Sequence, residues 1–304
     1  MGIESEWIWM DGAWVPYKDA TVHVLSHTLH YGLGAFEGIR AYEQPDGGPG
    51  VWRLDAHLER LLGSMRMVRM PVEWTVAQLR EACLAVLARN SFSAAYLRPL
   101  AFLGAGAMGL GARDNRVHLA ISAWEWGAYL GEENLTKGVR LRTSSFTRNH
   151  PNAALSRAKI VGHYVNSIMA RYEANDDGFD EALMLDHTGL VAEGSGENVF
   201  VVQDGRVTTP PATNILPGIT RLSVMEILRN EGVEVVEQPF GRDAFYVADE
   251  AFMCGTAAEI TPVASLDRRP VGAGARGPLT KRVQDIYAAA VRGTDPAYAA
   301  HIAR

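Results

Sequence analysis

Two short apolar runs near the amino end of the chain predict a β-hairpin. Trp7–Met10 and Ala13–Val15 flank Asp11-Gly12, and an Asp-Gly pair between apolar segments is typical of a two-residue hairpin turn. Residues 96–100 and 117–121 also have the composition of strands. The first part of the chain therefore contains a predicted sheet.

Two helices are predicted between these strands, because apolar residues recur there at spacings of three and four. The first helix follows Asp55, a candidate N-cap, and the second opens with a capping box formed by Thr75 and Gln78. The residues expected to face the core are Leu58, Leu61, Leu62 and Met65 on the first helix and Leu79, Cys83, Val86 and Leu87 on the second.

The second half of the chain is predicted to be rich in strands, with Asp204-Gly205 as the turn of one hairpin. The expected strands are 139–143, 181–185, 198–202, 206–209 and 233–238. Two helices interrupt them. One carries a single apolar face made of Val161, Val165, Ile168, Met169 and Tyr172. The other carries Val224, Ile227 and Leu228 and stops at Gly232.

These elements predict an α+β protein of two domains. We place a smaller α+β domain at residues 1–127 and a larger, β-rich α+β domain at residues 136–304. The connection at 128–135 contains glycine and has no apolar periodicity. A chain of 304 residues can bury a core in each domain. Small-molecule sites often lie between domains, so we expect the active site in the interdomain cleft.

Composition narrows the possible partners of the chain. A net charge of −6 argues against nucleic acid, whose binding needs clustered basic residues. We find no apolar run of the roughly 20 residues that a membrane span requires, and the acidic amino end is unlike a signal peptide. Cys83 and Cys254 have no metal-ligand spacing, so free thiols in the cytoplasm are expected. His23, His27 and His30 lie close together but lack carboxylate or cysteine neighbours, so we predict no metal.

Lys159 is the candidate for chemistry that depends on an amine. Only four of the 29 basic residues are lysines, and Lys159 alone has no acidic residue within ten positions. Lys18, Lys137 and Lys281 are expected on the solvated surface. An apolar setting lowers the pKa of a lysine, and a neutral lysine forms Schiff bases. Local sequence also allows a structural lysine whose amine reaches solvent from a helix end.

Seven segments, in order, resemble those of the branched-chain aminotransferases, which are fold-type IV pyridoxal-phosphate enzymes of the class IV aminotransferases. They are Tyr31–Arg40, Tyr96–Pro99, Trp126–Gly131, Ala158-Lys159, Glu193–Asn198, Leu216–Arg221 and Gly255–Pro262. The resemblance runs from about residue 7 to about residue 290. It implies a two-domain architecture similar to that of D-amino-acid aminotransferase.

The resemblance implies that Lys159 binds pyridoxal 5'-phosphate covalently and transfers the substrate proton. Glu193 matches the carboxylate that pairs with the pyridine nitrogen, where a negative charge favours the protonated ring. Tyr164 matches the residue that donates to the phenolic oxygen of the cofactor. Without the resemblance, Glu193 would be interpreted as a surface carboxylate and Tyr164 as a half-buried helix residue.

Phosphate binding is expected at a helix amino terminus and at an arginine. Ile219 and Thr220 open a helix after Pro217-Gly218, and backbone amides at such a terminus bind anions. Thr256 lies in a run of small residues that could supply further amides. Arg60 matches the family's phosphate-contacting arginine, although its place opposite the leucine stripe of its helix is that of a solvated side chain.

The resemblance also implies a substrate site that accepts an aliphatic side chain and the distal carboxylate of glutamate in turn. Arg98, with Tyr31 nearby, matches the group that binds the distal carboxylate. The remaining positions that match the site are Phe36, Leu110, Trp126 and Tyr129 in the apolar pocket and Tyr96, Thr256 and Ala257 at the α-carboxylate. From the residues alone, the aromatic side chains would be interpreted as core packing.

The implied reaction is a ping-pong transamination of L-leucine, L-isoleucine and L-valine with 2-oxoglutarate, giving branched-chain 2-oxo acids and L-glutamate. Leu110 would reach across a dimer interface, so a homodimer or a larger homo-oligomer is expected. D-Amino-acid aminotransferase and 4-amino-4-deoxychorismate lyase activities, and a non-catalytic ligand sensor, are the alternatives. The preferred substrate, the assembly beyond a dimer, the biosynthetic or degradative role and the roles of residues 144–157 stay open.

Overall fold

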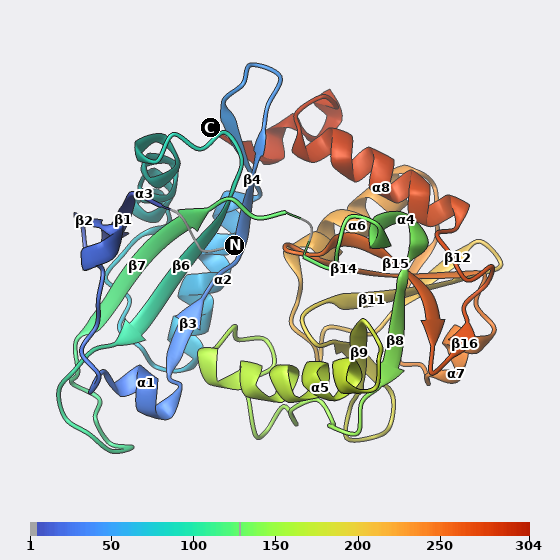
Figure 1. Cartoon of the computed structure of the whole chain (residues 1–304), viewed down its shortest axis with the longest axis horizontal. Coiled ribbons are helices and arrows are strands. Elements are labelled where there is room, and N and C mark those ends of the chain that lie inside the picture. The colour runs from blue at the N-terminus through green and yellow to red at the C-terminus, as the bar shows by residue number, and fades with distance from the viewer. Residues whose placement is uncertain (1–4, 128) are drawn as a thin grey trace. The chain divides into compact units, whose positions relative to one another are not determined.

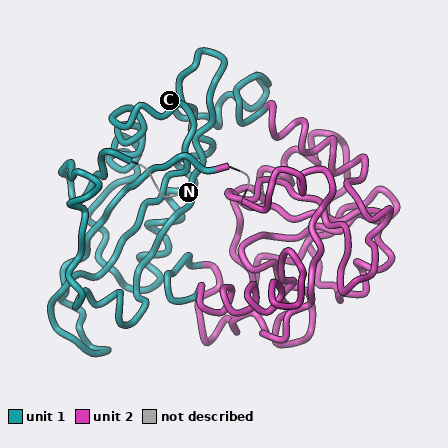
Figure 2. Tube along the Cα trace, viewed as in Figure 1, with its two compact units in different colours: residues 1–126, 158–163, 290–304 teal, residues 127–157, 164–289 magenta. Residues whose placement is uncertain are grey.

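The structure is a computed structural model that describes residues 5–127 and 129–304. Residue 128, the first of the predicted connection, lies outside the described residues. The chain divides into two compact units (Figure 2). Unit 1 consists of residues 1–126, 158–163 and 290–304, and unit 2 consists of residues 127–157 and 164–289.

The predicted division into two continuous domains is wrong at two places. Residues 158–163 belong to unit 1, because Ile160 forms a β-bridge with Ala35 and the Phe36 N–H donates to the Lys159 carbonyl at 3.1 Å. Residues 290–304 also belong to unit 1, where Ile302 pairs with Trp52 in the sheet. Both exchanges depend on pairing between segments that are distant in sequence.

Unit 1 is an antiparallel sheet with the strand order β17-β5-β4-β6-β7-β1-β2, and β3 pairs with β6 (Figure 1). Its strands are β1 Trp7–Met10, β2 Ala13–Pro16, β3 Gly34–Phe36, β4 Ile39–Glu43, β5 Pro49–Trp52, β6 Ala95–Leu103, β7 Val117–Trp124 and β17 Ile302–Ala303. Its helices are η1 Tyr17–Asp19, α1 His27–Tyr31, α2 Leu54–Met67, α3 Val76–Arg89, η2 Val161–His163 and η3 Pro296–His301.

The helices α2 and α3 bury the residues that their spacing predicts. All eight apolar side chains expected to face the core belong to one buried cluster, and the capping box of Thr75 and Gln78 is present. The predicted cap at Asp55 is wrong. The N-cap is Arg53, with a positive φ of 47°, and Asp55 lies in the first turn, where its negative charge complements the helix dipole.

Unit 2 is a mixed sheet with the strand order β10-β9-β8-β15-β14-β11-β12-β13, and β16 pairs with β15. Its strands are β8 Val139–Thr143, β9 Glu181–Leu185, β10 Val191–Gly194, β11 Asn198–Gln203, β12 Arg206–Thr209, β13 Val235–Glu237, β14 Glu250–Gly255, β15 Glu259–Leu266 and β16 Arg269–Pro270. Its helices are α4 Asn134–Lys137, α5 Tyr164–Asp176, α6 Ile219–Asn230, α7 Asp243–Tyr246 and α8 Pro278–Val291, whose last two residues belong to unit 1. The α+β class predicted from the sequence is confirmed.

The apolar face of α5 is exposed, although a core-facing role would be usual for such a stripe. Val165 is 61% exposed and Tyr172 is 62% exposed, whereas the buried side of the helix carries Ser167, Ala170 and Ala174. The small residues let the helix approach the sheet of unit 2 closely. By contrast, α6 buries Val224, Ile227 and Leu228 as predicted. In the described part of the chain, no helix combines the length and the apolar character needed to cross a membrane.

Candidate active site

Lys159 lies in unit 1, and both its backbone N–H and its backbone carbonyl form hydrogen bonds. Its carbonyl accepts from the Phe36 N–H at 3.1 Å, and its own N–H donates to the Ser64 hydroxyl on α2 at 3.0 Å. The flanking side chains of Ala158 and Ile160 are buried. The Lys159 amine lies 4.9 Å from the centre of the Phe36 ring. Lys159 is therefore half-buried in a fixed position over an aromatic ring.

The other three lysines occupy the surface, as predicted. Lys18 is exposed. Lys137 and Lys281 have side chains that are 71% and 54% exposed and pair with acidic residues one helical turn away. Their environment distinguishes them from Lys159.

The guanidinium of Arg98 lies among aromatic rings in the same unit. Its central carbon is 4.8 Å from the centre of the Phe36 ring, 5.4 Å from that of Tyr96 and 5.7 Å from that of Trp124. Trp126 packs edge-on against Tyr96, with ring centres 4.6 Å apart. Phe36 thus contacts the cations of both Lys159 and Arg98. Trp124 belongs to this group, but sequence interpretation did not single it out.

Tyr96 also requires a glycine beside it. A Cβ atom at Gly38 would lie 1.8 Å from the Tyr96 hydroxyl oxygen. Only glycine at this position leaves room for the hydroxyl, which explains one glycine of the segment that follows Phe36.

Tyr31 and Leu110, which also match the substrate site, are both exposed side chains of unit 1. Tyr31, on α1, is 43% exposed and its ring contacts His27 at 4.5 Å. Leu110 is 92% exposed, in a loop tied to α1 by the His27 ring and the Gly109 carbonyl at 2.9 Å.

Arg60 is buried rather than solvated, because a carboxylate on the neighbouring strand segment holds it. Its Nε and Nη2 atoms donate to Glu37 Oε1 at 2.6 Å and to Oε2 at 2.9 Å. His57 donates from Nδ1 to Glu37 Oε2 at 2.8 Å. Burial raises the pKa of Glu37, but the charge of Arg60 and the His57 contact outweigh it and hold that pKa well below its usual range. Burial keeps the pKa of His57 below its ordinary value.

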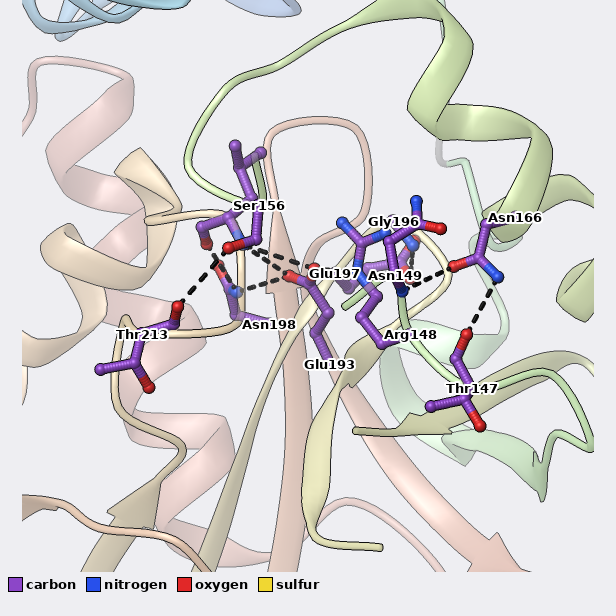
Figure 3. Close-up of polar contacts among 11 residues, drawn as sticks. Thr147, Arg148, Asn149, Ser156, Asn166, Glu193, Gly196, Glu197, Asn198 and Thr213 are labelled. Atoms are coloured by element: carbon purple, nitrogen blue, oxygen red, sulfur yellow. Dashed lines mark hydrogen bonds and ion pairs between the residues drawn. The ribbon is translucent and has the colours of Figure 1, made fainter. Parts of the chain in front are cut away.

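Glu193, at the end of β10 in unit 2, is buried and receives several donors (Figure 3). Arg148 Nε lies 2.7 Å from Oε1, and Asn198 Nδ2 lies 3.2 Å from Oε2. The Leu216 N–H also donates to Oε2, at 3.2 Å. Figure 3 shows Arg148 and Asn198 on opposite sides of the carboxylate. Glu193 is therefore a fixed, charge-compensated carboxylate rather than a surface group.

Asn198 links Glu193 to the amino terminus of α6. Its amide also donates to the Leu216 carbonyl at 3.0 Å, two residues before the N-cap, Gly218. A Cβ atom at Gly218 would lie 2.0 Å from Asn198 Oδ1, so the chain passes this side chain only as glycine. No side chain in the described part of the molecule caps α6. The first amides of α6, including those of Ile219 and Thr220, have no acceptor within the helix, and amides in this position attract anions.

A buried arginine holds the start of α6 in place. Arg221 is 2% exposed, and it donates to the Pro210 carbonyl at 2.9 Å and to Glu237 at 2.8 Å. This anchor fixes the first turn of α6 to β12 and β13. Sequence interpretation quoted Arg221 within a matching segment but gave it no role.

Tyr164 is the first residue of α5. The first turn of this helix also contacts, through Asn166, the segment that carries Arg148. Asn166 donates to the Thr147 carbonyl at 3.0 Å and accepts from the Asn149 N–H at 3.2 Å (Figure 3). Tyr164 and Arg148 are thereby placed on adjoining segments of unit 2. Residues 144–157, which sequence interpretation left unassigned, thus contain the cation that faces Glu193.

Thr256 and Ala257 lie in the turn between β14 and β15, next to the start of β11. Cys254 pairs with Asn198 in the sheet, and Asn198 also contacts the segment before α6. This turn and the start of α6 therefore both lie near one asparagine. Tyr129 is 41% exposed, and the Arg171 guanidinium lies 5.8 Å from its ring centre. Unit 2 therefore brings Glu193, Ile219, Thr220 and Thr256 around Asn198 and places Tyr129 on its surface.

Comparison with known proteins shows the family to which the chain belongs. Residues 34–266 match the family model described as Amino-transferase class IV. The chain is 48% identical to the branched-chain-amino-acid aminotransferase of Pseudomonas aeruginosa, over 96% of this chain and 95% of that protein. It is 44% identical to that of Escherichia coli, over 93% and 92% of the two chains.

Solved structures agree with the same relationship. The T.th. branched-chain amino acid aminotransferase, crystallised with pyridoxamine 5'-phosphate, superposes with a TM-score of 0.96 at 46% identity and covers 99% of both chains. A second structure of that enzyme, complexed with N-(5'-phosphopyridoxyl)-L-glutamate, gives a TM-score of 0.95 at 46% identity and the same coverage. These likenesses confirm the architecture that the resemblance implied. The chain belongs to the class IV aminotransferases and, within them, to the branched-chain-amino-acid aminotransferases.

Proposed function

We propose that the protein transfers amino groups between L-leucine, L-isoleucine or L-valine and 2-oxoglutarate, with pyridoxal 5'-phosphate attached to Lys159. The observation that carries the proposal is the position of Lys159, whose backbone is fixed by Phe36 and Ser64 and whose amine lies over the Phe36 ring. The names of the relatives support the substrate class.

Each unit carries residues whose chemistry fits part of a phosphorylated pyridine. Arg60 in unit 1, and the amides of Ile219, Thr220 and Thr256 in unit 2, would hold the phosphate. Glu193 would bind the ring nitrogen, and Tyr164 the phenolic oxygen. Arg148 Nη1 is buried and has no hydrogen-bond partner among the described residues. Such an atom indicates that a polar group completes this region.

When bound, pyridoxal phosphate supplies an electron-deficient ring that accepts the electron pair of the substrate α-carbon. The chain itself supplies the acid–base chemistry. Once the substrate amine has taken its place on the cofactor, the freed Lys159 amine would accept the proton from the substrate α-carbon and deliver it to the neighbouring carbon. Glu193 holds its negative charge against the ring nitrogen, and Arg148 and Asn198 hold Glu193 in place.

Arg98 explains how one site can accept two unlike side chains. Its guanidinium would bind the distal carboxylate of glutamate through charge-assisted hydrogen bonds. When an aliphatic side chain is present instead, the rings of Phe36, Tyr96 and Trp124 still surround the cation, and cation–π contacts offset part of the cost of its desolvation. The aliphatic substrates differ by single methylene groups, so discrimination among them should be modest.

A reduction experiment tests the role of Lys159. Borohydride treatment of the yellow holoprotein should fix the cofactor to the chain, and peptide mass spectrometry should locate it on Lys159. The Lys159→Ala variant should fold, bind cofactor without a covalent bond and have no transaminase activity. Attachment to another lysine would refute the mechanism. Turnover of D-alanine with 2-oxoglutarate, and none of L-leucine, would refute the substrate class.

We also propose that the protein is a homodimer in the cytoplasm. The exposed apolar side chains of α5, together with Val24, Leu29 and Leu110 in unit 1, support a second copy as the covering partner. The two buried free thiols support a reducing compartment. Sedimentation of the wild type should give a dimer, and Tyr172→Asp on α5 should weaken it. A monomeric wild type at micromolar concentration would contradict the proposal.

A further inference from the structure

Glu37 contacts Arg60, which is proposed to bind the phosphate, although sequence interpretation gave Glu37 no role. It is fully buried, and its two oxygens accept four hydrogen bonds, from Arg60 Nε and Nη2, His57 Nδ1 and the Gly38 N–H. A carboxylate beside a phosphate site is unexpected, because it repels the dianion that the site must bind.

Among Glu37, Arg60 and His57, the charges balance without a ligand. Glu37 is ionised, and burial keeps His57 neutral by lowering its pKa. The single negative charge therefore compensates the single positive charge of Arg60, whose side chain is only 12% exposed. A buried guanidinium without such a partner would carry a large desolvation cost.

We propose that Glu37 is an internal counter-ion that compensates Arg60 in the cofactor-free protein and thereby limits how tightly the site binds phosphate. The inference rests on the proposed function, in which Arg60 contacts the cofactor phosphate. Glu37 is a positioning residue, since it acts through Arg60. Glu37 stabilises the cofactor-free protein by compensating the charge of Arg60. It lowers the affinity for phosphate, because its own negative charge repels the ligand.

The Glu37→Gln variant separates charge from shape. Glutamine keeps the volume and one oxygen that can accept from Arg60, and its amide can donate to His57 in the other tautomer. The cofactor-free variant should melt at a lower temperature than the wild type. Its dissociation constants for inorganic phosphate and for pyridoxal phosphate, measured by thermal shift and by titration, should fall about tenfold, equivalent to about 1.4 kcal/mol.

Glu181→Gln is the matched control. Glu181 is also fully buried and paired with an arginine, Arg171, but it lies on β9 and has no part in the proposed function. The Glu181→Gln substitution should lower the melting temperature by the same amount with and without ligand, and it should leave the affinity for phosphate unchanged. If Glu37→Gln behaves in the same way, or binds phosphate more weakly, the counter-ion role is refuted.

The double variant Glu37→Gln/Arg60→Met keeps the test decisive if Glu37→Gln does not fold without ligand. The inference expects the cofactor-free double variant to be more stable than Glu37→Gln, because no unpaired charge is left, and to lose its response to phosphate. A double variant no more stable than Glu37→Gln would refute the counter-ion role. Unchanged phosphate affinity in the double variant would instead refute the contact between Arg60 and phosphate, which belongs to the proposed function.

Discussion

Arg148 Nε and Glu193 Oε1 are 2.7 Å apart, and their side chains are only 11% and 7% exposed. Two opposite charges that are both withdrawn from water depend on each other, because removing one leaves the other uncompensated. The pair also keeps an anion where the proposed mechanism needs one, beside the ring nitrogen of the cofactor.

Arg148→Met should therefore destabilise the protein more than a surface substitution does. The expected loss in the free energy of unfolding is about 3–5 kcal/mol, which urea denaturation of the cofactor-free protein would measure. Adding Glu193→Gln should restore part of that loss, since the double variant buries no unpaired charge. If the losses in the free energy of unfolding caused by the two single substitutions simply add in the double variant, the two side chains are not energetically coupled.

Arg98→Met should affect the two substrate classes unequally. Charge-assisted hydrogen bonds contribute about 1.5–3 kcal/mol each, so kcat/KM for 2-oxoglutarate should fall about tenfold to a hundredfold. Leucine has no distal charge, and its half-reaction should change much less. Single-turnover kinetics with each substrate would measure both values. Equal losses would show that Arg98 does not bind the distal carboxylate.

Features with both partners close together in sequence could be predicted before the fold was known. The capping box of Thr75 and Gln78 spans a single helical turn, and the Asp11-Gly12 turn joins adjacent strands. Lys159 could be selected because its neighbours lack acidic residues. In each case the physical cause lies within a few residues of the effect.

Pairings across long separations could not be predicted in the same way. Glu37 and Arg60 are 23 residues apart, and Arg148 and Glu193 are 45 apart. Which side of a strand or helix they occupy depends on the sheet, so the helical pattern alone placed Arg60 on a solvated face. Periodicity placed the apolar residues of α5 on one face but gave no information about what covers that face.

Gly218→Ala should disturb the site through Asn198. The added Cβ would lie 2.0 Å from Asn198 Oδ1, so the amide must leave its contacts with Glu193 and the Leu216 carbonyl. Cofactor affinity, measured by titration of the stripped protein, should weaken about tenfold. Gly196→Ala, where nothing lies within 4 Å of the new atom, is the control. Equal affinities in the two variants would contradict the role of Asn198.

The rates at which the two cysteines are alkylated should report on the opening of each unit separately. Cys83 lies in unit 1 and Cys254 in unit 2, and both are fully buried. Burial raises the pKa of Cys83 to about 12 and that of Cys254 further still, so neither thiolate forms at mildly alkaline pH. The native protein should resist iodoacetamide, and denaturant should expose both thiols. Rapid labelling of either cysteine in native buffer would show that its unit opens locally.

Glu173 should contribute an acid-sensitive part of the stability of unit 2. Burial raises its pKa, but hydrogen bonds from Ser145 and Ser144 and the contact with Arg142 outweigh this and lower the pKa from 4.5 to about 2. Since the folded state binds the proton less readily, this stabilisation is complete above pH 4.5 and is lost as the pH falls towards 2. Glu173→Gln should therefore flatten the dependence of the unfolding free energy on pH in that window. Asp46→Asn, which removes an exposed ion pair with Arg304, should leave the slope unchanged. Parallel slopes for Glu173→Gln and the wild type would assign the acid sensitivity to other carboxylates.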